Sequence, residues 1–132
     1  MSDTFYIPRL IMSKMSLSTP DVISRFDSLE EALKSVFPKV DPRSVIGLIL
    51  HEKKEKNPLY TLETLIKPGQ NTEDIREVIL KVTGMAPGFY LSGTKIVVTH
   101  KLSLELLKRI NDLDYVVSIK AAPYSAGASS DF

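Results

Sequence analysis

The chain has 132 residues, of which 43% are hydrophobic and 25% charged, values typical of one globular domain with a packed core. Its 17 Lys and Arg residues nearly balance its 16 Asp and Glu residues, so the net charge of +1 gives no overall attraction to nucleic acid or to anionic membranes. The absence of cysteine excludes disulfides, thiolate metal sites and a cysteine nucleophile, and it is consistent with a cytoplasmic protein.

The sequence shows no targeting or membrane segment. Its first residues lack a charged stretch followed by a long apolar one, which argues against a signal peptide. No apolar run approaches the roughly 20 residues that cross a bilayer. We therefore expect a soluble, cytoplasmic protein with no membrane partner.

The N-terminal part, residues 1–57, is predicted to begin with a short edge strand. The run FYIPRLI at 5–11 is largely apolar, but Pro8 has no N–H to donate within a central strand. A short helical segment is then predicted from Pro20 to Phe26.

The clearest helix of this part is predicted at 28–37. Ser28 and Glu31 match a capping box, in which each side chain satisfies a free backbone N–H at the start of a helix. The continuous run SVIGLIL at 44–50 is apolar and rich in β-branched residues, which predicts a buried strand. Residues 1–57 are thus expected to form an N-terminal α/β extension packed on the rest of the fold.

The second part, residues 58–124, alternates strand and helix patterns more regularly. Each helix has a single apolar stripe. The expected N-cap of the first helix is Asn71 or Thr72, and that of the second helix is Ser103. The order strand, helix, strand, strand, helix, strand predicts an α+β fold, the ferredoxin-like split βαβ sandwich with both helices on one face of an antiparallel sheet. The strands are predicted at 59–66, 88–91, 95–100 and 115–120, and the helices at 72–83 and after Ser103.

The helix-free face of this sheet is where the sequence leaves its alternatives open. That face is expected to be solvated, covered by residues 1–57, or used for binding.

The residues that could carry chemistry do not form a recognisable catalytic or metal-binding set. His51 and His100 each follow an apolar run and lack a third ligand at close spacing, so we interpret them as exposed histidines at strand ends. The acidic pairs fall in first helical turns, where the helix dipole accounts for them. Serine-hydrolase and phosphate-loop motifs are also missing. We therefore expect no enzyme activity, no metal and no cofactor.

Nucleic-acid binding is a further alternative with little support. The basic run at 53–56 is diluted by acidic residues and is typical of a solvated turn. RNA-binding domains of this topology stack bases on aromatic residues of two central strands. Phe89 and Tyr90 lie on one candidate strand, but its partner offers only Tyr60, so a nucleic-acid partner is not expected.

Two segments of the second part resemble a known family. The stretches YTLETLIKPGQNTEDIREVILKVTG and KLSLELLKRINDLDYVVSIKA resemble the opening and closing segments of subtilisin propeptides and their free-standing inhibitor relatives. The resemblance covers residues 59–124 and rests on the order of patterns. It implies a ferredoxin-like propeptide domain and a protein partner, a subtilisin-like serine protease, whose surface helices pack against the sheet.

The same resemblance implies a role for the C-terminal segment, which would extend into the protease cleft as an added strand. Ala121, Ala122, Pro123 and Tyr124 are of the kind that a subtilisin-like pocket accepts, and by spacing Ala128 matches the specificity-pocket residue. Residues 125–132 are expected to be a flexible tail, because small polar residues are equally typical of a disordered terminus.

These observations lead to one functional hypothesis and its alternatives. We expect a non-enzymatic protein-binding module, a protease inhibitor or chaperone that uses the open sheet face and the C-terminal tail. The alternative is an oligomeric regulatory or small-ligand-binding ferredoxin-like protein, which would include a homodimer.

Overall fold

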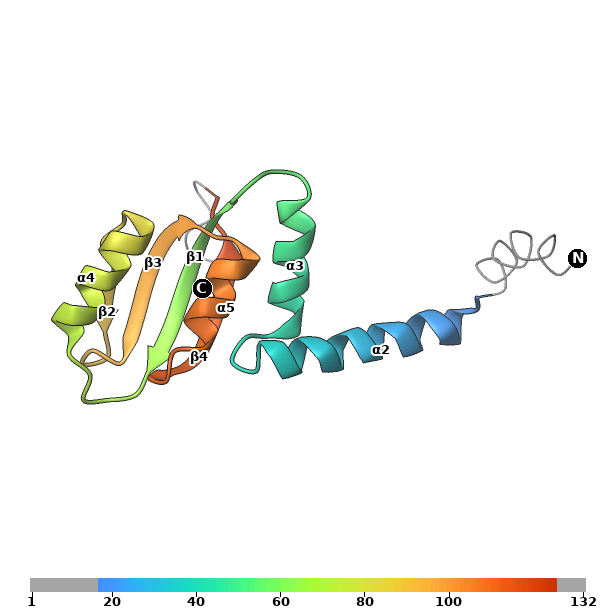
Figure 1. The fold of residues 1–132 in the computed structure, drawn as a ribbon, viewed down its shortest axis with the longest axis horizontal. Helices are drawn as coiled ribbons and strands as arrows, with labels where there is room; N and C mark the ends of the chain where they lie inside the picture. Colours follow the sequence, from blue (N-terminus) through green and yellow to red (C-terminus); the bar gives the residue numbers. More distant parts are fainter. Residues whose placement is uncertain (1–16, 126–132) are drawn as a thin grey trace, which may run out of the picture. The chain divides into compact units, whose positions relative to one another are not determined.

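The computed structural model describes residues 17–125 of the chain. The described residues fall into two compact units, one ending at Ala32 and the other beginning at Leu33. They form an α+β structure with four helices and one four-stranded sheet (Figure 1). In chain order the elements are α2 (Thr19–Val36), α3 (Pro42–Glu52), β1 (Leu59–Ile66), α4 (Thr72–Thr83), β2 (Gly88–Tyr90), β3 (Lys95–Lys101), α5 (Leu104–Asn111) and β4 (Val116–Pro123).

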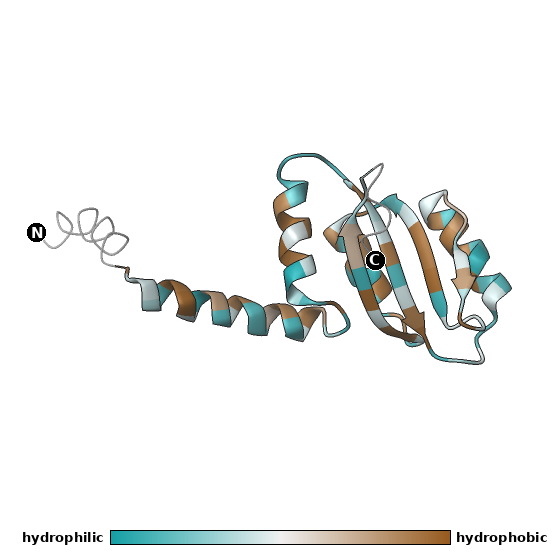
Figure 2. Cartoon of the chain, turned by 180° about the vertical axis from the view of Figure 1, so that it is seen from behind, coloured by the Kyte–Doolittle hydropathy of each residue, from teal (hydrophilic) through white to brown (hydrophobic). Residues whose placement is uncertain are grey.

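The sheet has the strand order β2-β3-β1-β4, and every pair of neighbours is antiparallel. With a helix between β1 and β2 and another between β3 and β4, this is the order predicted for a ferredoxin-like α+β fold, and the prediction is confirmed. Both α4 and α5 lie on one face of the sheet (Figure 1). Figure 2 presents the opposite face, along which hydrophobic and polar segments alternate.

The alternation along β1 shows which side chains belong to the core. Tyr60, Leu62, Thr64 and Ile66 are buried, whereas the residues between them are half-buried or exposed. This period of two is expected for a strand with one face covered by helices. The core also includes Leu102 and Leu107, with Val45 and Leu48 from α3 and Val116 and Ile119 from β4.

The ends of α4 and α5 form as predicted. The Asn71 side chain accepts hydrogen bonds from the backbone N–H groups of Glu73 and Asp74, and α4 ends at Gly84 with φ of 77°. The Ser103 side chain accepts from the N–H of Leu106 and begins α5. These caps satisfy donors that a helix start leaves unpaired, and glycine is favoured at a left-handed helix end.

The prediction of a strand at 44–50 is wrong, because these residues form part of helix α3. Asp41 caps this helix by accepting a hydrogen bond from the N–H of Arg43, and Pro42 occupies its first position. Proline there loses no helical hydrogen bond and has a preset φ. A short apolar run fits a buried helix as well as a buried strand, so the Asp-Pro start was the deciding signal.

The predicted helix start at Ser28 is also wrong. Ser28 lies inside α2, which is one continuous helix from Thr19 to Val36. Its capping box is formed instead by Ser18 and Asp21: the Ser18 N–H donates to Asp21 Oδ2 over 2.9 Å, and the Asp21 N–H donates to Ser18 Oγ over 3.4 Å. The strand predicted at 5–11 lies outside the described residues. None of the helices in residues 17–125 has the length and apolar character needed to cross a membrane.

The segment before α3 covers part of the outer edge of β4. Val40 forms a parallel bridge with Ile119, whose N–H donates to the Lys39 carbonyl oxygen over 2.9 Å. The Lys39 N–H donates in turn to Oδ1 of the buried Asn111 in α5. These bonds give backbone groups at the outer edge of β4 a hydrogen-bond partner from within the same compact unit.

Candidate ligand-binding groove

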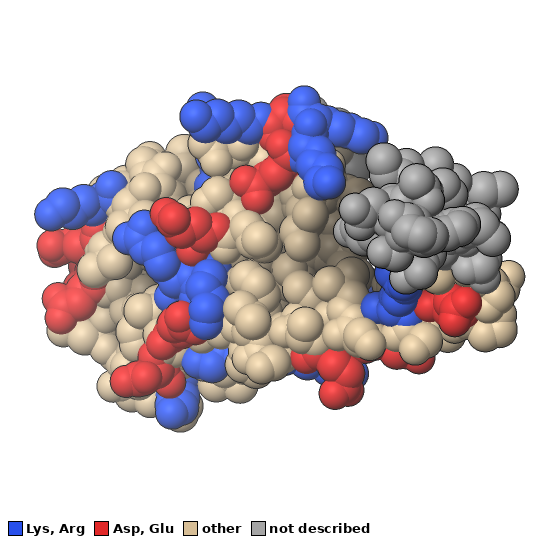
Figure 3. All heavy atoms as spheres, turned by 45° about the vertical axis from the view of Figure 1, so that its right-hand side comes forward, with Lys and Arg blue, Asp and Glu red and all other residues tan. Residues whose placement is uncertain are grey.

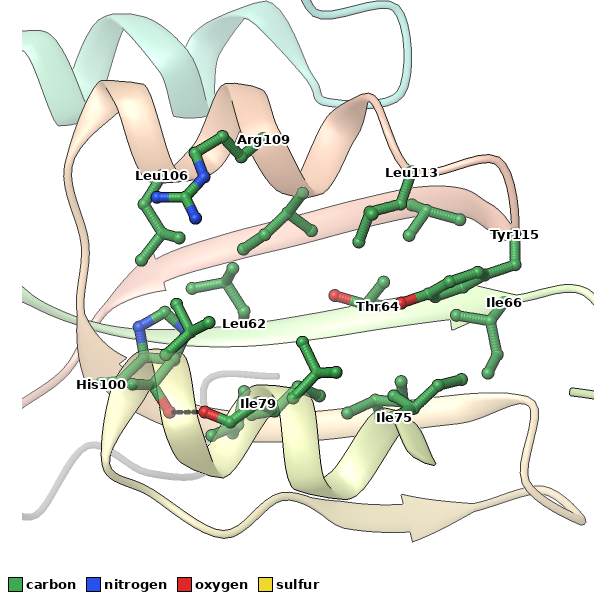
Figure 4. Close-up of a pocket in the computed structure, with 17 residues that line it drawn as sticks. Leu62, Thr64, Ile66, Ile75, Ile79, His100, Leu106, Arg109, Leu113 and Tyr115 are labelled. Carbon is green, nitrogen blue, oxygen red and sulfur yellow. Dashed lines mark hydrogen bonds between the residues drawn. The ribbon is translucent and has the colours of Figure 1, made fainter. Parts of the chain in front are cut away.

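Helices α4 and α5 lie side by side on the sheet without closing over it, and an apolar groove runs between them (Figure 4). Its cavity has a volume of about 160 Å³. The floor comes from β1 and β3, and the walls come from the two helices and from the turn after α5. The labelled lining residues are Leu62, Thr64, Ile66, Ile75, Ile79, His100, Leu106, Arg109, Leu113 and Tyr115.

The α4 wall shows why the groove is open. Ile75 is buried against the sheet, but the later residues of the same stripe, Val78 and Val82, are exposed, Val78 by 55%. Leu113 is exposed on the opposite wall. Apolar side chains that line a hollow and stay in contact with water are typical of an interaction site.

Two hydroxyl groups face this apolar groove without a protein partner. The side chains of Thr64 and Tyr115 make no hydrogen bond within residues 17–125, although Thr64 is only 7% exposed. No side-chain polar atom of the described residues is both sealed from solvent and unbonded, so the Thr64 hydroxyl must open into the groove. Figure 4 shows the Tyr115 ring lying along the floor with its hydroxyl toward Thr64. Burial raises the pKa of Tyr115, so this hydroxyl stays protonated near neutral pH.

His100 supplies a third polar group to the groove. Its Nδ1 lies 2.7 Å from the carbonyl oxygen of Lys101, and because a carbonyl only accepts, Nδ1 carries the proton. The other ring nitrogen, Nε2, is then an acceptor, and within the described residues it has no partner. Burial lowers the pKa of His100, against a smaller opposing effect of the Lys101 hydrogen bond, so the ring is neutral near pH 7.

The interpretation of both histidines as exposed strand-end residues is wrong. His100 is only 2% exposed, because it continues the buried alternation of Ile96 and Val98 along β3. His51 lies in α3 and is half-buried, with Nδ1 3.3 Å from the Tyr60 hydroxyl. The period of two in KIVVTH was the signal that could have placed His100 in the core.

Arg109 brings a positive charge to the rim of the groove. Its side chain is exposed on α5 and forms no ion pair within residues 17–125. Figure 4 shows its guanidinium at the same end of the groove as His100. Arg76 of α4 differs, because it pairs with Glu73 over 3.2 Å and lies over the Phe89 ring. The groove thus combines apolar walls, two hydroxyls, a neutral imidazole and one available cation.

The site residues predicted from the resemblance are found mostly in the sheet. Ala121, Ala122 and Pro123 belong to β4 and pair with β1, and Ala121 is buried. Tyr124 is exposed, but its N–H donates to the Leu59 carbonyl oxygen over 2.9 Å. Ala128 lies outside the described residues. A role of these residues in binding a partner therefore stays a prediction.

The same segment borders a second, broader depression between α3 and β4. Ala121, Ala122 and Pro123 line one side of it, and Arg43 and Lys54 lie on the side of α3. This depression is more open than the groove between α4 and α5, so a small molecule would bury less of its surface there.

The helix-free face of the sheet is mixed, because the exposed hydrophobic residues Leu59, Leu65 and Tyr90 lie among polar side chains. Thr61 and Thr99 share a hydrogen bond of 2.8 Å across β1 and β3, and Glu63 pairs with Lys95 over 3.3 Å. Tyr90 is the only aromatic side chain on this face of the described strands, since the register places Tyr60 and Phe89 on the helix side. This face therefore offers few aromatic rings on which nucleic-acid bases would stack.

The charges of the surface are mixed. Positive and negative side chains are interspersed on the side of the molecule that Figure 3 presents. Within residues 17–125, no group of three or more His, Cys, Asp or Glu side chains is placed to hold a metal ion. Comparisons with family models, with curated proteins and with solved structures all gave no match.

Proposed function

We propose that this chain is a non-enzymatic binding module whose ligand site is the groove between α4 and α5. The observation that supports the proposal is an apolar cavity lined by polar groups that have no hydrogen-bond partner within residues 17–125. The hydroxyls of Thr64 and Tyr115 and Nε2 of His100 open onto one apolar cavity without a partner within residues 17–125, so a ligand with a polar group of its own would replace solvent at these atoms.

The size of the cavity limits the ligand. Apolar cavities of about 150 Å³ are known to accept benzene. A cavity of about 160 Å³ therefore suits one aromatic ring or a branched aliphatic group of similar volume.

The polar groups indicate what such a ligand should carry. The unprotonated Nε2 of His100 accepts a hydrogen bond, and the hydroxyls of Thr64 and Tyr115 can accept or donate. A ring with a hydroxyl or N–H group would satisfy them, whereas a plain hydrocarbon would leave them unpaired. Arg109 at the rim would favour a ligand that also carries a carboxylate.

The test compares phenol with toluene, which have nearly the same shape but differ in the hydroxyl. Titrations of the full chain are followed by amide shifts in two-dimensional NMR spectra. We expect phenol to shift signals of groove residues and to bind at least about tenfold more tightly than toluene. Thr64→Val with Tyr115→Phe should remove most of this preference and leave toluene binding unchanged.

The outcome that contradicts the proposal is equally direct. If neither compound shifts groove signals at millimolar concentration, or if the shifts scatter over the surface, the groove is not a ligand site. Ser118→Ala, a change on the helix-free side of β4, is the matched control and should bind both compounds as the unmodified chain does.

A second candidate is the protein-binding function that the resemblance implies, inhibition or chaperoning of a subtilisin-like protease. It is supported by the ferredoxin-like order of the strands and by the absence of a covering element on the helix-free face within residues 33–125 (Figure 2). A cytoplasmic location, expected from the cysteine-free sequence, stays a prediction with it.

This candidate is tested by adding the full chain to subtilisin and following peptide hydrolysis. Inhibition should weaken with Val97→Glu, which adds a charge to the helix-free face, and should persist with Val78→Glu in the groove. No inhibition at about 10 μM would exclude a tight inhibitor of this kind.

A further inference from the structure

Helix α2 carries an apolar stripe that is exposed to solvent. Val22, Phe26 and Leu29 have exposed fractions of 59%, 45% and 44%, although they are large hydrophobic residues. Figure 2 shows hydrophobic segments recurring along this helix. Exposed apolar stripes of this kind mark sites where another surface packs.

The spacing of the stripe is that of a coiled-coil seam. Val22 and Phe26 are four residues apart, and Phe26 and Leu29 are three apart, which is the alternation of d, a and d positions in a heptad. Leu33 continues the spacing, but it is only 8% exposed and belongs to the core that begins there, so the free seam ends at Leu29. Ile23, 56% exposed, lies beside the seam at an e position, and the remaining faces of this part of α2 are mainly polar, with Ser24, Asp27, Ser28 and Glu31.

The charges beside the seam indicate the partner. With Phe26 at an a position, Arg25 occupies the preceding g position and Glu30 the following e position. In a parallel pair of helices, g of one helix faces the next e of the other, so Arg25 would meet Glu30 of a second copy on both sides of the seam. In an antiparallel pair the g positions of the two helices face each other, so Arg25 of one copy would lie beside Arg25 of the other.

We propose that α2 pairs with the α2 of a second copy of this chain in a parallel two-stranded coiled coil, with Phe26 at its centre. The free seam spans about two helical turns, so the association is weak and depends on protein concentration. The proposal does not rest on the groove between α4 and α5, and either one stands if the other fails.

The first test is sedimentation of the full chain over a range of concentrations. Phe26→Asp places a charge in the seam, and Ser24→Asp places the same charge on the polar face of the same helix. We expect the first to raise the dimer dissociation constant at least about tenfold and the second to leave it within about twofold. A chain that stays monomeric up to millimolar concentration, or equal effects of both changes, would overturn the proposal.

Charge exchange tests the parallel register. Arg25→Glu and Glu30→Arg should each weaken the dimer, because each sets like charges against each other, and the two changes together should restore it. Failure of the double variant to recover would exclude the parallel pairing. Circular dichroism of each variant verifies that the helix content is unchanged.

Since the chain has no cysteine, a single engineered thiol reports the same geometry. In a parallel pair the d positions of the two copies lie opposite each other, so mild oxidation of Leu29→Cys should join the two copies through a disulfide. Ser28→Cys on the polar face should cross-link far more slowly. Equal rates for the two variants would contradict a specific seam.

Discussion

The carbonyl oxygen of Lys39 accepts a hydrogen bond from the N–H of Ile119 over 2.9 Å, and this bond ties the segment before α3 to the edge of the sheet. The N–H of the same lysine donates to Asn111 Oδ1 over 3.0 Å, while Asn111 Nδ2 donates to Asp112 Oδ1 over 3.1 Å. Asn111 is 2% exposed, so it holds together α5 and the segment that covers β4.

We therefore expect Asn111→Ala to lower the free energy of unfolding by about 2 kcal/mol, because the Lys39 N–H would lose its partner in a partly buried place and the buried Asn111 side chain would be lost. Urea unfolding followed by circular dichroism measures this difference. Glu105→Ala on the exposed side of α5 is the control and should change it by less than about 0.5 kcal/mol. Equal effects of the two changes would show that the Asn111 bond is not structural.

The stability of the fold should depend on pH through His100. Its pKa in the folded chain lies below the ordinary value of 6.5 because the ring is buried. As the pH falls below 6.5, the unfolded chain takes up a proton that the folded chain resists, so stability is lost on acidification; well above 6.5 both forms are neutral and the residue adds no pH dependence. Unfolding by urea at several values between pH 5 and 7.5 should show this loss.

His100→Gln removes the ionisable group from the same position. We expect this variant to lose a smaller part of its stability between pH 7.5 and 5, whatever its stability at neutral pH. If the two pH profiles are parallel, the histidine is not the group responsible.

The walls of the groove should contribute less to stability than the core beneath them. Leu107→Ala empties a fully buried position in α5 and should cost about 2–5 kcal/mol. Val78→Ala on the exposed wall of α4 should change stability by no more than about 0.5 kcal/mol, since little apolar surface is lost and alanine favours a helix. Thermal unfolding compares the two, and a large loss from Val78→Ala would mean that the groove closes in solution.

The second half of the fold was predictable because its signals are local and agree with each other. Asn71 and Ser103 begin helices, Gly84 ends one, and strands with a period of two lie between them. With these elements and their order known, the topology rules leave few arrangements, and the ferredoxin-like order is one of them.

The groove was harder to foresee than the fold. It depends on the distance between α4 and α5 on the sheet, and no local sequence pattern predicts that distance. The sequence predicted a single apolar stripe on α4, but periodicity could not tell that Ile75 of this stripe would be buried while Val78 and Val82 stay exposed. The period of two along β3 could have placed His100 on the same face as Ile96 and Val98, but it could not predict the groove that the ring borders.

The error in α3 had a different origin, because the deciding residue lies outside the apolar run. Asp41 accepts a hydrogen bond from the Arg43 N–H over 2.9 Å, and this cap favours a helix in a segment whose β-branched residues favour a strand. We expect Asp41→Ala to lower the free energy of unfolding by about 1 kcal/mol, and Asp41→Asn, which keeps an acceptor at the cap, to have little effect. Urea unfolding of the two variants distinguishes them. Similar losses for alanine and asparagine would indicate that the charge of Asp41, rather than its hydrogen bond, stabilises the start of α3.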